Sequence, residues 1–250
     1  MKTDKDLFLG TFLSLSSPTV AEVCGKYPFD WIMIDGEHGA GASEDAIFRI
    51  LQAMGPTKAK KIVRLGEPDH AQIQHALDWG ADGLMIPHVD TPEIAKKALD
   101  SMLYPPKGHR GYSRSVRTFG YGTALPEVPP KPLLFAQIET LEAVENVEAI
   151  AAVEGVDVLF VGPADLGFDL KARGSSLTLD DCLPKVAVVP DSAFPVSFGE
   201  RGSFHADVTS ADALRDILSV EGGKAYNIVM AGLRSTVRNL PGRARLLVGQ

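Results

Sequence analysis

One stretch of this sequence ends an apolar run abruptly in charged residues. Residues 31–34 are apolar at every position, and Asp35, Glu37 and His38 follow directly, separated and closed by glycines. An uninterrupted apolar run suits a parallel strand that is covered on both faces. Because parallel α/β sheets carry reacting groups at the carboxyl ends of their strands, we expect these three polar side chains to lie at a functional edge.

Strand-like and helix-like patterns alternate along the rest of the chain. Ser43 is placed to cap one helix, and Thr91 with Pro92 opens another. Strands are expected at residues 7–15, 29–35, 61–65, 82–87, 133–139, 157–161, 194–198 and 226–230. Helices are expected at residues 18–26, 43–54, 68–77, 91–99, 141–150 and 211–220, whereas residues 171–190 match neither pattern. This order predicts an α/β fold, a (β/α)₈ TIM barrel in one domain of residues 1–250, with divergent carboxyl-terminal units.

Composition narrows the classes of partner. The chain has 250 residues, 45% of them hydrophobic, and a net charge of −7. That charge argues against nucleic acid or an anionic membrane as the main partner. The polar first residues are no signal peptide and no apolar run reaches the ~20 residues of a membrane helix, so we expect a cytoplasmic protein. Cys24 and Cys182 match no metal or redox spacing and are expected to be reduced packing residues.

Polar residues end several of the expected strands. Arg64 ends the third strand, Gln137 and Glu139 end the fifth, and Asp165 follows the sixth. Two carboxylates without clustered Cys or His suit Mg²⁺ or Mn²⁺, with water or substrate completing the coordination. Arg64 is placed to hold a substrate carboxylate or a developing enolate. His38 has the intrinsic pKa of a general base, which Asp35 or Asp78 would orient.

Each of these residues also has a purely structural interpretation. Glu139 and Asp165 could be a surface or cap pair, and Arg64 could be an ion-pair partner. Glu37 could pair across an interface, and Gln137 could support a ligand or be satisfied in the interior. The loop at 104–121, which carries Arg114, Arg117 and Tyr121, is either functional or a solvated excursion. The remaining histidines are expected on helix or loop surfaces: His70, His75, His88, His109 and His205.

Five motifs occur in a fixed order: FDWIMIDGEHGA, IVRLGEPDHAQIQHALDWGADGLMIPHVDTPEIAKKAL, YPPKGHRGYSR, FAQIET and VDVLFVGPADL. They resemble the HpcH/HpaI-type class II pyruvate aldolases, relatives of the hydroxy-oxo-heptanedioate and 2-keto-3-deoxy sugar-acid aldolases. The resemblance covers residues 7–168, and residues 168–250 match the family poorly. The tail lacks the usual Gly-rich seventh strand and the Gly-Ser-Asp-type turn, so the last units of the barrel are expected to diverge from the family.

The resemblance implies a metal-dependent carbon-carbon lyase. Such an enzyme reversibly cleaves a 4-hydroxy-2-oxo acid to pyruvate and an aldehyde through a metal-stabilised pyruvate enolate. Glu139 and Asp165 would hold Mg²⁺, Mn²⁺ or Co²⁺. Arg64 would bind the keto oxygen, and Gln137 would line the pyruvate site.

The same resemblance implies roles for the other candidates. His38 would perform acid/base chemistry with support from Asp35 and from Asp78, the latter from a neighbouring subunit. Backbone amides near Gly162 and Ala164 would cradle the pyruvate carboxylate. Because family members are commonly hexamers that exchange a terminal helix, a homo-oligomer is expected.

Two other functions stay open from the sequence. One is a related metal-enolate lyase or decarboxylase, such as an oxaloacetate decarboxylase or a citrate-lyase-like enzyme. The other is a non-catalytic scaffold that keeps the barrel face but has lost its chemistry through the altered tail.

Overall fold

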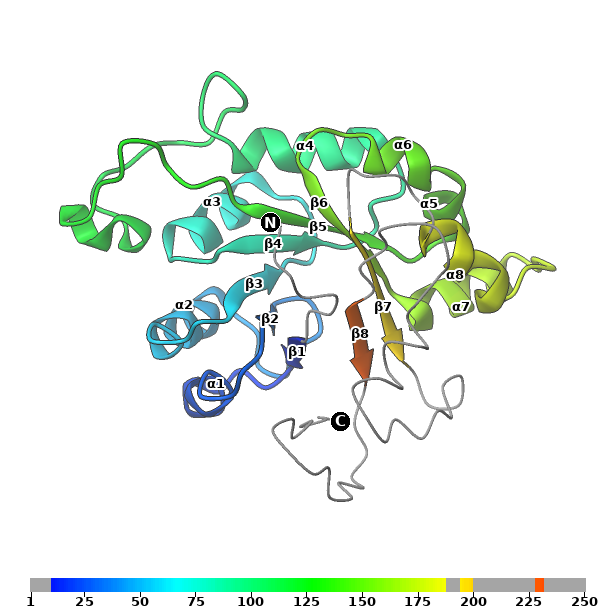
Figure 1. Ribbon diagram of the computed structural model, residues 1–250, viewed down its shortest axis with the longest axis horizontal. Coiled ribbons are helices and arrows are strands. Elements are labelled where there is room, and N and C mark those ends of the chain that lie inside the picture. The colour runs from blue at the N-terminus through cyan, green and yellow to red at the C-terminus, as the bar shows by residue number, and fades with distance from the viewer. Residues whose placement is uncertain (1–9, 188–193, 200–227, 232–250) are drawn as a thin grey trace.

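The computed structural model describes residues 10–187, 194–199 and 228–231. Its centre is a sheet in which every neighbouring pair of strands is parallel and the spatial order follows the sequence (Figure 1). The strands are β1 (Gly10–Leu13), β2 (Trp31–Asp35), β3 (Lys60–Arg64), β4 (Gly83–Ile86), β5 (Leu133–Ile138), β6 (Val156–Val161), β7 (Phe194–Gly199) and β8 (Ile228–Ala231). A parallel order of this kind requires a crossover connection after each strand.

Helices supply the crossovers from β1 to β7 and lie around the outside of the curled sheet (Figure 1). They are α1 (Pro18–Cys24), α2 (Glu44–Ala53), α3 (His70–Asp78), α4 (Pro92–Met102), α5 (Leu141–Glu145), α6 (Val147–Ala151), α7 (Pro163–Ala172) and α8 (Leu179–Ala187), with the 3₁₀ helix η1 (Arg117–Gly122) between α4 and β5. Ser43 accepts a hydrogen bond from the amide of Ala46 and so caps α2, as its position in the sequence predicted.

The prediction of a closed (β/α)₈ barrel is wrong. Strands β1–β6 form a curled half-barrel sheet of six strands, each followed by at least one helix. The backbone of β7 pairs with β6, and that of β8 pairs with β7. No helix follows either strand in the part of the chain that the structure describes. Closure requires the last strand to hydrogen-bond to the first, and the described ladders stop at β7–β8.

Two apolar clusters lie on the two faces of the sheet. The larger one joins the outward-facing strand residues to the helices, as with Ile32 and Ile34 of β2. The smaller one fills the concave face and contains Trp31, Met33, Ile62, Met85, Phe135, Val158 and Phe160. Successive strand residues point to opposite faces, so this alternation decides which polar residues turn inward.

The carboxyl-terminal part of the chain and the two cysteines were also the subject of predictions from the sequence. The segment 171–190, which the sequence pattern did not assign, contains the end of α7 and all of α8. The expected helix at 211–220 and His205 lie outside the described residues. Cys24 and Cys182 are free thiols, and both contact the larger apolar cluster, as predicted.

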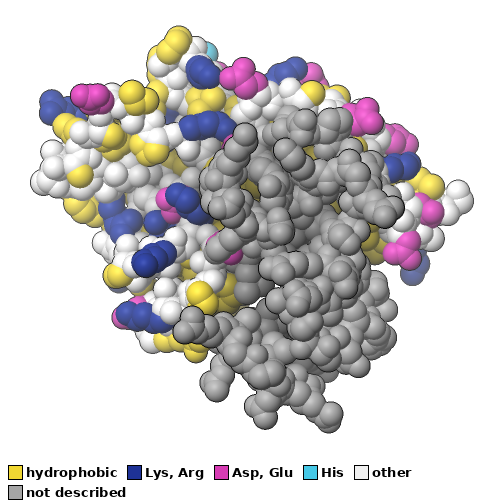
Figure 2. All heavy atoms as spheres, viewed as in Figure 1, with side chains coloured by type: hydrophobic (Ala, Val, Ile, Leu, Met, Phe, Trp, Pro, Cys, Tyr) yellow, Lys and Arg dark blue, Asp and Glu magenta, His cyan; other side chains and the backbone are white. Residues whose placement is uncertain are grey.

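The surface and the helix lengths bear on the expected partners. Among the described helices, none is both long and apolar enough to cross a membrane. On the face seen in Figure 2, basic and acidic side chains are interspersed over the described surface rather than separated into one basic patch. That distribution accords with the net charge of −7.

Candidate active site

The candidate residues continue the inward-facing positions of their strands. On β2, Trp31 and Met33 belong to the concave cluster, and Asp35 follows two residues later. On β5, Phe135 belongs to the same cluster and Gln137 follows two residues later. Because side chains alternate with a period of two, both polar groups point to the concave face at the carboxyl edge of the sheet.

Asp35 and Arg64 form a two-pronged ion pair between β2 and β3. Arg64 donates from Nε to Asp35 Oδ1 at 3.0 Å and from Nη2 to Asp35 Oδ2 at 2.9 Å. Its Nη1 lies 3.1 Å from Oε2 of Glu37, and its guanidinium carbon lies 5.3 Å from the centre of the Phe12 ring. Asp35 and Arg64 are both buried. A planar guanidinium held by two carboxylates and a ring has one orientation, so its remaining N–H groups have fixed directions.

The turn after β2 is built around the Asp35 carboxylate. Its Oδ1 accepts the backbone N–H of His38 at 3.0 Å and that of Glu37 at 3.2 Å. Burial alone raises the pKa of Asp35, but the hydrogen bonds and charge of Arg64 and these two amides outweigh burial and hold the pKa below its usual value. A Cβ at Gly39 would lie 2.2 Å from the Asp35 carbonyl oxygen, so this turn requires glycine.

His38 is the exposed member of this group. Its side chain is 66% exposed, whereas that of Glu37 is 14% exposed, and Nε2 of His38 lies 3.8 Å from Oε1 of Glu37. An exposed imidazole beside a carboxylate can exchange protons with solvent and with a bound molecule.

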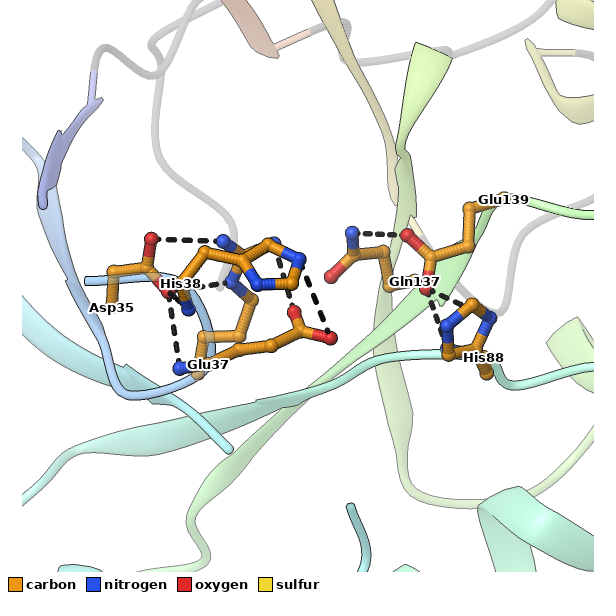
Figure 3. Close-up of polar contacts among 7 residues, drawn as sticks. Asp35, Glu37, His38, His88, Gln137 and Glu139 are labelled. Atoms are coloured by element: carbon orange, nitrogen blue, oxygen red, sulfur yellow. Dashed lines mark hydrogen bonds and ion pairs between the residues drawn. The ribbon is translucent and has the colours of Figure 1, made fainter. Parts of the chain in front are cut away.

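A second group faces the first from β4 and β5 (Figure 3). Glu139 follows β5 and is 2% exposed. Its Oε1 accepts the backbone N–H of His88 at 2.7 Å and lies 3.3 Å from Nδ1 of the same residue, and its Oε2 accepts from Nε2 of Gln137. His88 follows β4 in the left-handed region with φ 49°. A non-glycine residue in that conformation costs free energy, and such residues cluster at functional sites.

The Glu139 carboxyl is held in an environment that favours its protonated form. Burial raises its pKa most, and the negative charges of Asp165 and Glu37 raise it further, although His88 opposes them. A Cβ at Gly162 would lie 2.7 Å from Oε2 of Glu139, so only glycine leaves room for the carboxylate. A buried carboxyl whose pKa is raised by burial and by neighbouring negative charges is a candidate for a functional role.

The oxygen donors around Glu139 can be related to the needs of a divalent metal ion. Within the described residues, no three His, Cys, Asp or Glu side chains form a cluster suited to a metal. Asp165 nonetheless lies near enough to Glu139 for its charge to raise the pKa of Glu139, and Oε1 of Gln137 is buried without a hydrogen-bond partner. Two carboxylates and an unsatisfied amide oxygen fit a hard cation that keeps several of its waters.

Asp78 is the one proposed site residue that the structure separates from the others. It ends α3, at the opposite end of the sheet, and its Oδ1 accepts a 2.7 Å hydrogen bond from Nη2 of the buried Arg110. Within one chain, Asp78 therefore does not orient His38.

The expected amide cradle at the start of α7 is partly engaged elsewhere. The N–H of Gly162 donates to the carbonyl of Ile138 at 3.1 Å, and Pro163 has no N–H. The amides of Ala164 and Asp165 belong to the first helical turn and have no partner within α7. Of the expected cradle, only these two first-turn amides could therefore donate hydrogen bonds to an anion.

The sequence pattern missed two residues that contact the candidate site: His88, which contacts Glu139, and Phe12, which contacts Arg64. His88 was expected only as a surface residue; its ring is indeed exposed, but its backbone and ring contact Glu139. The signal was its position, because it follows the carboxyl end of β4 just as the other candidates follow their strands. Phe12 gave no such signal, since an apolar residue in a strand is ordinary core.

Polar groups gathered at the carboxyl edge of a parallel sheet are typical of α/β proteins that bind small molecules at that edge. The family comparison makes this more specific. The chain belongs to the HpcH/HpaI aldolase/citrate lyase family, whose model matches residues 9–181.

Curated relatives resemble the same part of the chain. It is 44% identical over 172 residues to a 4-hydroxy-2-oxovalerate aldolase of Novosphingobium aromaticivorans, covering 67% of this chain and 65% of the relative. It is 38% identical over 169 residues to a 2-keto-3-deoxy-L-rhamnonate aldolase of Salmonella gallinarum, covering 66% and 63%. The chain thus spans just under two thirds of the length of these relatives.

Solved structures agree on the fold. An HpcH/HpaI aldolase/citrate lyase family protein from Burkholderia cenocepacia superposes with a TM-score of 0.74 at 29% identity, covering 90% of this chain and 89% of the other. An HpcH/HpaI aldolase from Desulfitobacterium hafniense superposes with a TM-score of 0.71 at 27% identity, covering 89% and 85%.

Proposed function

We propose that this protein is a class II aldolase that reversibly cleaves a 4-hydroxy-2-oxo acid to pyruvate and an aldehyde. The two aldolase relatives support the reaction class. The observation that carries the proposal is that two groups lie at one edge of the sheet: a fixed guanidinium at the end of β3 and a buried, proton-favouring carboxyl directly after β5. Figure 3 shows Glu37, which pairs with that guanidinium, on the opposite side of the site from Gln137 and Glu139.

Cleavage breaks the bond between C3 and C4 of the substrate. The C4 hydroxyl loses its proton, its oxygen becomes the aldehyde oxygen, and the bonding electrons move into the C2–C3 bond and onto the C2 oxygen. A proton delivered later to C3 turns this enolate into pyruvate. The protein must therefore stabilise negative charge at the C2 oxygen and move two protons.

Arg64 is suited to the charge that develops on the C2 oxygen. Asp35 and Glu37 hold its guanidinium in place before substrate arrives, so no reorganisation is required during the reaction. These two carboxylates do not use all five guanidinium N–H donors. A remaining donor would bind the oxygen more strongly as it becomes an enolate.

His38 is suited to the proton of the C4 hydroxyl. Its ring is exposed at the edge, and Glu37 lies beside its Nε2. In the neutral form the imidazole accepts the hydroxyl proton, and the nearby Glu37 carboxylate stabilises the resulting cation. The reverse transfer serves the synthetic direction.

A divalent cation would be held by Glu139 and Asp165, with Gln137 adding its unsatisfied Oε1. Such an ion supplies Lewis-acid polarisation of the 2-oxo group. His88 holds the Glu139 carboxylate through its backbone N–H. Mg²⁺ and Mn²⁺ are the ions that this oxygen donor set suits.

The proposal is tested by incubating the full chain with pyruvate, a panel of aldehydes and Mn²⁺, and by following new carbon-carbon bonds by NMR. We expect metal-dependent hydroxy-oxo acid formation and its reversal on dilution. Absence of product across the panel, combined with no exchange of the pyruvate methyl protons in deuterated water, would refute the proposal.

The same assay separates the competing functions. Release of CO₂ from oxaloacetate without aldol product would indicate a decarboxylase. A requirement for a coenzyme A thioester would indicate a citrate-lyase-like enzyme. A scaffold would show no chemistry and no stabilisation by Mn²⁺, because mass action raises stability only where the ion binds the folded state.

A further inference from the structure

A cavity of 620 Å³ lies at the end of the sheet opposite the candidate active site. Lys60 and Lys61 begin β3, Asp82 precedes β4 and Leu133 begins β5, and all four line the cavity. The loop between α4 and β5 closes the other side. The volume of the cavity falls within the range of small-molecule binding sites, about 300–1,000 Å³.

Two buried hydrogen-bond donors at this cavity have no partner. Arg110 is 5% exposed, and its Nε has no hydrogen-bond partner. The buried hydroxyl of Tyr104 has no hydrogen-bond partner either. Both residues line the cavity, and the Arg110 guanidinium carbon lies 4.6 Å from the centre of the Tyr104 ring. An unsatisfied buried donor is costly, so a ligand that brings an acceptor would be stabilised by both groups.

Both donors interact with the Asp78 carboxylate. Nη2 of Arg110 donates to Oδ1 of Asp78 at 2.7 Å. Burial raises the pKa of Tyr104, with Asp78 and Tyr112 adding to the rise and Arg110 opposing it, so the phenol remains a donor. Together these two side chains offer N–H and O–H groups and require an acceptor.

Positive charge exceeds negative charge around the cavity. Lys60 and Lys61 share a single carboxylate, Asp82, at 3.7 and 2.9 Å. Arg117 donates from Nη1 to the carbonyl of Trp79 at 2.6 Å and forms no ion pair with a described acidic residue. An anion would therefore gain electrostatic stabilisation on entering.

The remaining wall is apolar. Phe119, Leu77 and Leu133 line it, as do prolines at 129, 130 and 132. A bare inorganic ion would leave this surface wet, whereas a ligand with an apolar body would cover it. We propose that this cavity is a binding site for a small organic anion, with its charged group at Arg110, Tyr104 and Arg117 and its apolar body against Phe119 and the prolines.

Benzoate and phenyl phosphate are the probes, and titration calorimetry and thermal unfolding are the readouts. The full chain is titrated with EDTA present, so that no metal ion recruits the probe to the carboxyl edge. At least one probe should bind saturably and raise the melting temperature. Benzyl alcohol, which has the same ring without the charge, should not bind, and inorganic phosphate should bind at least about ten-fold more weakly than phenyl phosphate because it buries no apolar surface.

Two substitutions locate the site. Tyr104→Phe removes only the unpartnered hydroxyl and should weaken binding about five-fold, as loss of one hydrogen bond does, without lowering the melting temperature of the free protein. Tyr112→Phe is its control, because Tyr112 is exposed and does not line the cavity. Arg117→Gln should weaken binding about ten-fold, whereas Arg114→Gln in the same loop should not.

Three outcomes would overturn the proposal. The first is that neither probe binds saturably. The second is equal affinity for phenyl phosphate and inorganic phosphate, because the apolar wall would then contribute nothing. The third is unchanged affinity in both Tyr104→Phe and Arg117→Gln. None of these results bears on the aldolase reaction, which is assayed separately with Mn²⁺ and whose residues lie at the other end of the sheet.

Discussion

Asp35 and Arg64 are register partners on adjacent parallel strands, and each turns its side chain to the concave face. The pair is therefore built by the sheet itself and not by a loop. Both groups are buried at the carboxyl edge, so the guanidinium is rigid where the C2 oxygen of the proposed substrate would lie.

Arg64→Ala should lower turnover about 10²-fold or more, as loss of an oxyanion donor does in other enzymes. Exchange of pyruvate methyl protons in deuterated water should fall equally, because exchange passes through the same enolate. Stabilisation by Mn²⁺ should persist, since Arg64 contacts neither Glu139 nor Asp165 in any described hydrogen bond or ion pair. An Arg64→Ala protein that exchanges at the parent rate would contradict the role given to this residue.

Glu139→Gln should abolish both turnover and the rise in melting temperature caused by Mn²⁺, because the remaining carboxylate holds the ion poorly against water. Glu142→Gln is the control, since Glu142 is exposed in the first turn of α5. In the parent, Mn²⁺ stabilisation should weaken as the pH falls. Protons compete for a carboxyl with a raised pKa, so the loss should begin above the usual glutamate pKa of about 4.3. If Mn²⁺ stabilised the parent and Glu139→Gln equally, Glu139 would not be a ligand of the metal ion.

Asp35→Asn should reduce the free energy of unfolding at pH 7 by about 3 kcal/mol, because it leaves a buried guanidinium with only Glu37. The pKa of Asp35 is lowered in the folded state, so its contribution is complete above the unfolded pKa of about 3.9 and disappears as the pH falls through the folded value. Urea unfolding between pH 3 and pH 7 should show the two proteins converging at the acid end.

The control for Asp35→Asn is Asp45→Asn, which breaks an exposed ion pair with Arg49 and should cost at most about 0.5 kcal/mol. A difference between parent and Asp35→Asn that is as large at pH 3 as at pH 7 would show that the charge of Asp35 is not what stabilises the fold.

Gly162→Ala should impair metal binding and turnover far more than stability. The added methyl would lie 2.7 Å from Oε2 of Glu139 and 3.0 Å from Nε2 of Gln137, so the carboxylate must move. Gly167→Ala in the same helix is the control, because its methyl would meet Leu179 at 3.6 Å, which is ordinary contact. That change should stabilise α7 by about 0.5–1 kcal/mol. Parent-like Mn²⁺ stabilisation in Gly162→Ala would show that Glu139 is not held by this close approach.

The sequence by itself determined the alternation of strands and helices over residues 10–161 and the edge at which Asp35, Arg64, Gln137 and Glu139 lie. Both follow from local rules: periodicity identifies the element, and the end of an apolar run identifies its carboxyl edge. The motifs also identified the family, because their order along the chain is itself sequence information.

Only the tertiary structure decided which of these groups touch. Arg64 meets Asp35 across 29 residues and His88 meets Glu139 across 51, contacts that depend on strand register and on the path of a turn with positive φ. Asp78 instead accepts a hydrogen bond from Arg110, because it ends a helix that runs away from the carboxyl edge of the sheet. The closed barrel failed for the same kind of reason: each strand can be recognised locally, but closure requires the last strand to pair with the first, and no local pattern encodes that long-range contact.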